Sequence, residues 1–127
     1  MMKKLLATVF TVVFLSMAGF PAGPATQEIK SAATWEIRAW NRIVVRPAYK
    51  EEIKIRLHGV EANAVDRQSL KRARQVTRRL VAGKVVDVLV LGECERGQVL
   101  ARVTLPDGRD LGMVLVQSGV AHQAVSG

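Results

Sequence analysis

Apolar and polar residues alternate along most of the chain, and the alternation is interrupted by one central helical segment. Three strands are predicted before residue 58. Segments 35–39 and 51–57 have the period of two that is typical of half-buried strands, and 43–45 is a short apolar run between them. The third places Ile53, Ile55 and Leu57 on one face and charged residues on the other. Pro47 ends the second strand because proline has no backbone donor for a ladder. We expect these strands to form an antiparallel meander.

The central segment, 66–82, has helical spacing. The positions expected to face the core share a period near 3.6: Leu70, Ala73, Val76 or Thr77, Leu80 and Val81. Asp66 or Ser69 can cap the start of this helix, and Gly83 is suited to its end.

Two further strands are predicted at 84–91 and 98–105, followed by a closing helix that Asp110 caps and Gly119 ends. Three strands, a helix, two strands and a helix is the order of a small barrel of the oligonucleotide/oligosaccharide-binding (OB) type. The predicted fold class is therefore α+β, mainly β, with a five-stranded OB-fold-like barrel and two or three helices.

The first 25 residues have the pattern of a secretory signal peptide, with a basic start, an apolar run over 5–20 and small residues after it. A membrane anchor is the alternative, but the run is shorter than the ~20 residues that span a bilayer. We expect export to the periplasm or medium of a bacterium, with no transmembrane segment after cleavage. A mobile leader is predicted over 26–33 and one domain over 34–127.

The chain is basic, with a net charge of +8 that falls to +6 when Lys3 and Lys4 leave with the signal peptide. Such a charge suits nucleic acid, an acidic polysaccharide or an anionic membrane surface, although a basic protein without such a partner has the same composition. Four residues of the helix form a basic stripe: Arg67, Lys71, Arg74 and Arg78. The stripe is either a solvated face or a shared phosphate-binding surface.

Other candidate chemistry is sparse. Cys94, the one cysteine, cannot form an internal disulfide, and its neighbouring glutamates disfavour a thiolate, which leaves a structural role or intermolecular pairing. His58 and His122 are expected to be exposed, and with one cysteine they make no zinc site. Trp35 is expected in the core, whereas Trp40 is either a core residue or an exposed stacking surface.

Four motifs follow one another along the chain in the order in which a known protein family has them. They are Arg56-Leu57-x-Gly59-Val60-Glu61-Ala62, Leu80-Val81-Ala82-Gly83-Lys84-Val85-Val86-Asp87-Val88, Val99-Leu100-Ala101-Arg102-Val103-x-Leu105-Pro106-Asp107-Gly108-Arg109-Asp110-Leu111 and Leu115-Val116-x-x-Gly119-Val120-Ala121. Over roughly 37–124 the chain resembles the staphylococcal nuclease (thermonuclease-like) family. The resemblance implies the same five-stranded barrel, and active members are calcium-dependent phosphodiesterases acting on DNA and RNA.

The resemblance also assigns the family's catalytic positions. Asn41 stands at the first calcium-binding aspartate, Arg56 at the phosphate-binding arginine and Glu61 at the second calcium-binding aspartate. Ala64 stands at the carboxylate regarded as the general base, and Gln98 at the second arginine. Only Arg56 is retained unchanged. Asp66 is a possible replacement base, although helix capping is the role its position favours.

These departures favour a catalytically degenerate, exported domain that binds nucleic acid, another polyanion or a protein partner through its basic face. It would need no cofactor, and calcium only if residual nuclease activity exists. The alternatives are an active calcium-dependent phosphodiesterase with a rearranged site, and a structural component of the cell envelope.

Overall fold

The computed structural model describes residues 27–63 and 65–124. In chain order its elements are β1 (Gln27–Ala39), β2 (Arg42–Arg46), β3 (Ile53–Leu57), β4 (Val60–Ala62), α2 (Arg67–Val81), β5 (Val85–Glu93), the 3₁₀ turn η1 (Glu95–Gly97), β6 (Gln98–Thr104), α3 (Leu111–Gln117) and β7 (Ala121–Gln123). The predicted signal peptide, 1–25, lies outside the described residues.

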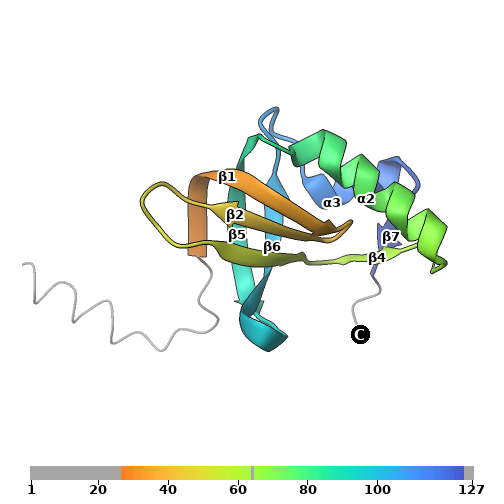
Figure 1. Cartoon of the computed structure of the whole chain (residues 1–127), viewed down its shortest axis with the longest axis horizontal. Coiled ribbons are helices and arrows are strands. Elements are labelled where there is room, and N and C mark those ends of the chain that lie inside the picture. The colour runs from red at the N-terminus through yellow and green to blue at the C-terminus, as the bar shows by residue number, and fades with distance from the viewer. Residues whose placement is uncertain (1–26, 64, 125–127) are drawn as a thin grey trace, which may run out of the picture.

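Five strands close into a barrel in the order β1-β2-β3-β6-β5 (Figure 1). Strands β3 and β6 pair in parallel, and the other neighbouring strands pair antiparallel. The short strands β4 and β7 form a separate antiparallel pair, which the sequence pattern did not predict. The predicted α+β class with a five-stranded, OB-fold-like barrel and two helices is confirmed.

Side chains from alternate strand positions fill the barrel. Ile43, Ile55 and Val103 come from three different strands and are almost fully buried, as are Leu111 and Leu115 of α3. Burying a side chain of this size contributes roughly 1.5–3 kcal/mol. The strands and α3 therefore share one core.

Helix α2 begins and ends where its sequence predicts. The Asp66 carboxylate accepts a hydrogen bond from the Ser69 backbone N–H at 2.9 Å, and this bond lowers the pKa of Asp66. Gly83 follows the helix with φ of +71°, a conformation that glycine adopts without steric cost. Residues of the predicted inner face are buried or half-buried, among them Ala73, Thr77 and Val81.

Two side-chain hydrogen bonds fix α2 to the turn between β1 and β2. The Thr77 hydroxyl donates to the Trp40 carbonyl at 2.7 Å in a fully buried position. The Arg74 Nε–H donates to the Ile37 carbonyl at 2.9 Å. Helix α2 consequently lies across the end of the barrel near β4 and β7 (Figure 1).

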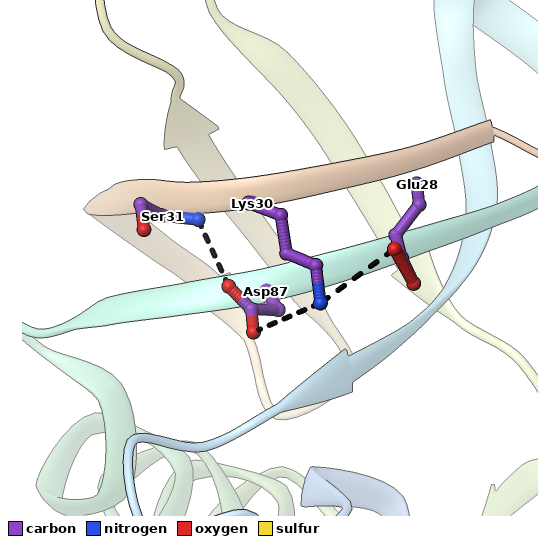
Figure 2. Close-up of polar contacts among 4 residues, drawn as sticks. All are labelled: Glu28, Lys30, Ser31 and Asp87. Atoms are coloured by element: carbon purple, nitrogen blue, oxygen red, sulfur yellow. Dashed lines mark hydrogen bonds and ion pairs between the residues drawn. The ribbon is translucent and has the colours of Figure 1, made fainter.

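The prediction of a mobile leader over 26–33 is wrong for 27–33, because these residues form the first half of β1. They pair with β5, from Gln27 opposite Val90 to Ala33 opposite Val85. The Ser31 N–H also donates to the Asp87 carboxylate at 2.9 Å, and Lys30 lies between Asp87 and Glu28 (Figure 2). Backbone pairing with an apolar strand far along the chain orders this small, polar segment, so local composition did not reveal it.

The prediction of a buried Trp35 is also wrong, since its side chain is 61% exposed. The register of β1 against β2 shifts between Thr34 and Glu36. Such a bulge changes which residues face the core, so Thr34 is buried in place of Trp35, while Ile37 is buried as the alternation predicts. Arg46 lies over the exposed Trp35 ring, 4.4 Å from its centroid. Trp40, whose environment the sequence left open, is buried with 6% exposure.

Candidate nucleic-acid interface

The retained arginine of the predicted site lies on the outer face of the barrel. Arg56 is an exposed residue of β3, opposite Arg42 on β2 and Leu100 on β6. Gln98 lies at the start of β6, opposite Lys54, and is half-buried. Arg56 and the neutral Gln98 therefore lie near one another on β3 and β6, as the resemblance requires.

Asn41 lies close to the same part of the barrel. Its backbone carbonyl accepts a hydrogen bond from the Leu57 N–H at 2.9 Å. This contact brings the turn between β1 and β2 against the end of β3, next to Arg56. The position that the resemblance matches to a calcium-binding aspartate therefore carries a neutral amide.

Glu61 belongs to the small β4–β7 sheet, where its carboxylate lies 3.6 Å from Nε2 of His122. His122 Nδ1 lies 2.7 Å from Oδ1 of Asn63. The Asn63 amide donates to the carbonyls of Gly119 and Ala121, at 2.7 and 3.2 Å. Since Oδ1 is the acceptor, the Nδ1–H of His122 donates to it, and Nε2 of the same ring faces the Glu61 carboxylate.

These residues do not fit a calcium ion. Calcium takes six to eight oxygen ligands, and its affinity rises with the number of carboxylates. Within 27–63 and 65–124, no three His, Cys, Asp or Glu side chains gather in a way that could hold a metal. Asn41 and Glu61 supply one amide and one carboxylate, and the carboxylate already faces His122. Ala64 lies outside the described residues, and its side chain has no donor atom.

The structure divides the predicted basic stripe of α2 into different roles. Arg67, Lys71 and Arg78 are exposed, whereas Arg74 is half-buried and bonded to the Ile37 carbonyl. Arg74 therefore has a structural role in addition to its charge. The 15-residue helix contains six Lys or Arg residues and no Asp or Glu.

Three of the four stripe residues line a groove between α2 and the β1–β2 turn. The groove has a cavity volume of about 430 Å³, and its lining residues are Arg38, Ala39, Trp40, Asn41, Arg42, Arg67, Leu70, Lys71 and Arg74. Arg78 is not among them. We call this feature the α2 groove. It also contains Arg38 and Arg42, which were not predicted as site residues. Both are basic residues close to Asn41 in the sequence, and that closeness is the signal that could have identified them.

A closed five-stranded barrel with an arginine on β3 and a basic helix across one end defines a nuclease-like OB-fold domain. The family of staphylococcal nuclease homologues matches residues 54–126, more than half of the chain, and the protein belongs to this family. No curated protein matches the chain. The family places the domain among nuclease-like, nucleic-acid-related proteins.

No helix in the described part of the chain is long and apolar enough to cross a membrane.

Proposed function

We propose that this protein is an exported, non-hydrolysing member of the staphylococcal nuclease family that binds a polyanion through the basic face of α2. The observation that carries the proposal is the arrangement of charge. Arg67 and Lys71 face the same groove as Arg38 and Arg42, whereas Glu61, at the position of a metal-binding carboxylate, faces His122. The basic side chains that can bind phosphate therefore face one groove, whereas the carboxylates that hydrolysis needs do not gather around a common point.

The chemistry of phosphodiester hydrolysis supports this proposal. The reaction needs an activated water, a cation on the phosphoryl oxygens and fixed positive charge for the transition state. Ala64 has no proton acceptor, Gln98 has no charge and Asn41 is a neutral ligand. Losing one such group typically costs ~10² to 10³ in rate. Binding needs none of these groups, and calcium is not required for it.

Polyanion binding by this surface is electrostatic. Each phosphate that a Lys or Arg neutralises releases condensed counterions, so affinity falls steeply as salt rises. Export, which we propose from the pattern of residues 1–25, would place the protein in the periplasm or the medium. The ligand would then be nucleic acid or another polyanion that occurs there, and a protein partner with an acidic surface is the second possibility.

The test is a paired assay on the purified mature protein. We expect no cleavage of DNA or RNA above a blank, with calcium or with a chelator. We also expect binding to single-stranded DNA that weakens strongly between 50 and 200 mM salt, by roughly 300-fold if six phosphates are contacted. Calcium-dependent cleavage that Arg56→Ala abolishes would instead establish an active phosphodiesterase. The absence of any salt-dependent binding would favour the structural role in the envelope.

A further inference from the structure

The α2 groove has an apolar floor and a cationic rim. Trp40 and Leu70 are among the apolar residues that line it. On the rim, Arg38 and Arg42 come from the β1–β2 hairpin, and Arg67 and Lys71 come from α2. The two walls are far apart in the sequence, and only the docking of α2 brings them together.

Buried contacts hold the two walls at a fixed separation. The Thr77 hydroxyl bonds to the Trp40 carbonyl at 2.7 Å, and Arg74 bonds to the Ile37 carbonyl at 2.9 Å. Both bonds join α2 directly to the strand that ends at the groove. A site whose walls are fixed before binding loses less conformational entropy when a ligand enters. The α2 groove is therefore preorganised.

The charge of the α2 groove differs from that of two other hollows in the described residues. One of these, of about 330 Å³, includes Asp110 with Arg102 and His58 in its lining. Another, around the β2–β3 loop, mixes Glu51 and Glu52 with basic residues. The lining of the α2 groove contains five Lys or Arg residues and no Asp or Glu. Among the salt bridges of the described residues, one involves the lining of the groove: the exposed pair Arg38–Glu36, 3.4 Å apart. Exposed pairs of this kind contribute little.

We propose that the α2 groove binds a single strand of nucleic acid, with phosphates on the rim and a base against the apolar floor. Four of the five basic residues are arginines, and the guanidinium fork matches the geometry of phosphate oxygens. Apolar and aromatic floors accept bases of any sequence. This inference rests on the function proposed above and names its ligand and its location.

The dimensions of the groove favour a single strand over the other polyanions. A cavity of about 430 Å³ admits a nucleotide or two, whereas a duplex keeps its bases stacked inside and presents only phosphates to such a surface. An acidic peptide offers carboxylates but no large planar group for the floor. Asn41 is the one position matched to the family's catalytic residues that lines the groove, so this site is displaced from the retained Arg56.

The test compares two double variants with equal loss of charge. Arg42→Ala with Lys71→Ala removes one rim residue from each wall. The control, Arg72→Ala with Arg79→Ala, removes two exposed cations of the same helix that do not line the groove. Arg74 is left intact because it joins α2 to β1. The probe is a fluorescent oligo(dT) titrated with each protein at several salt concentrations.

We expect the groove variant to bind oligo(dT) at least tenfold more weakly than the parent protein and the control about as well as the parent. The salt dependence of the groove variant should fall by about 0.7 for each lost phosphate contact on a single strand. Equal effects of the two double variants would overturn the groove as the site. A blunt duplex or poly-glutamate that competes as well as oligo(dT) at equal charge would overturn the single strand as the ligand.

A second measurement reports on the groove directly. Trp35 and Trp40 are the two tryptophans of the chain, and Trp35 is exposed, so Trp35→Phe should fold and leave Trp40 as the sole indole. Oligo(dT) should change the emission of Trp40 in this background and should do so much less when Arg42→Ala and Lys71→Ala are added. Unchanged emission at saturating ligand would contradict binding against the floor.

The experiments distinguish polyanion binding by the protein from the assignment of that binding to the α2 groove. If the parent binds no polyanion, the proposed function and the groove are both wrong. If it binds with a steep salt dependence and the groove variant behaves like the control, only the groove assignment is wrong.

Discussion

The α2 groove and the small β4–β7 sheet, which we call the β4–β7 corner, lie at the same end of the barrel. Positive charges gather in the groove, whereas in the corner a negative charge lies beside a histidine. In the groove, cations from two elements face one cavity, and a buried bond from Thr77 and a partly buried bond from Arg74 hold the elements together. In the corner, the Glu61 carboxylate is matched by His122, through exposed contacts that also involve Asn63. The comparison teaches that one end of a nuclease-family barrel can gather cations in a groove while a nearby carboxylate contacts a histidine.

The largest expected effect comes from the packing beneath the groove. Val81 is fully buried at the end of α2, and an aspartate there would bury a charge without a partner. We expect Val81→Asp to lose its cooperative melt, because this cost exceeds the ~5–15 kcal/mol that stabilises a typical domain. Leu80→Asp should be less severe because Leu80 is only half-buried, and exposed Arg78→Gln should melt like the parent. A parent-like melt of Val81→Asp would contradict the docking of α2.

The second largest expected effect is a gain of nuclease activity when the family's catalytic residues are restored, one of them in the corner. Combining Asn41→Asp, Glu61→Asp, Ala64→Glu and Gln98→Arg restores the family's residues around Arg56. We expect calcium-dependent cleavage of DNA from the combined variant, and almost none from single reversions, because groups that act as a unit are strongly non-additive. Arg56→Ala in the combined background is the control and should remove the gain. A single reversion as active as the full set would contradict this interpretation.

Two buried threonines give a smaller, matched comparison. Thr77→Val removes the donor to the Trp40 carbonyl and should destabilise the protein by about 1–3 kcal/mol, because the carbonyl stays buried. Thr34 is also buried, but within the described residues its hydroxyl has no hydrogen-bond partner. Thr34→Val should therefore be neutral or stabilising. Urea denaturation measures both, and an equal cost would show that the Thr77 bond does not fix α2.

The smallest effects are expected in the corner. Asn63→Ala removes two bonds to the Gly119 and Ala121 carbonyls, and His122→Ala removes one bond and a pair with Glu61. Because these groups are largely exposed, water replaces much of what is lost, and we expect about 1 kcal/mol or less for each. A cost for Asn63→Ala above that of Thr77→Val would reverse the ranking of the two regions.

Much of the fold could be predicted because its signals are local. The helical period and caps located α2 almost to the residue, and alternation located β3 and most of β5 and β6. The motifs identified the family, and the family match over residues 54–126 confirms it. The composition of α2 indicated a basic face without any knowledge of its neighbours.

The features of the fold that could not be predicted depend on contacts between segments that are distant in the sequence. Residues 27–33 are ordered by pairing with β5, and β7 exists because β4 lies beside it. A bulge in β1 exposes Trp35, and neither hydrophobicity nor spacing marks a bulge of this kind. The residues of the predicted stripe also have different surroundings, since Arg74 bonds to β1 and Arg78 lies outside the groove.

The sequence by itself determined the barrel, the central helix and the family, because periodicity, caps and motifs are properties of neighbouring residues. The tertiary structure decided which charges act together. Arg42 and Lys71 are 29 positions apart, and they share a groove because Thr77 and Arg74 fix α2 against the β1–β2 turn. Glu61 faces His122 because β4 pairs with β7. Electrostatic interactions depend on distance in space, and distance in space is set by packing.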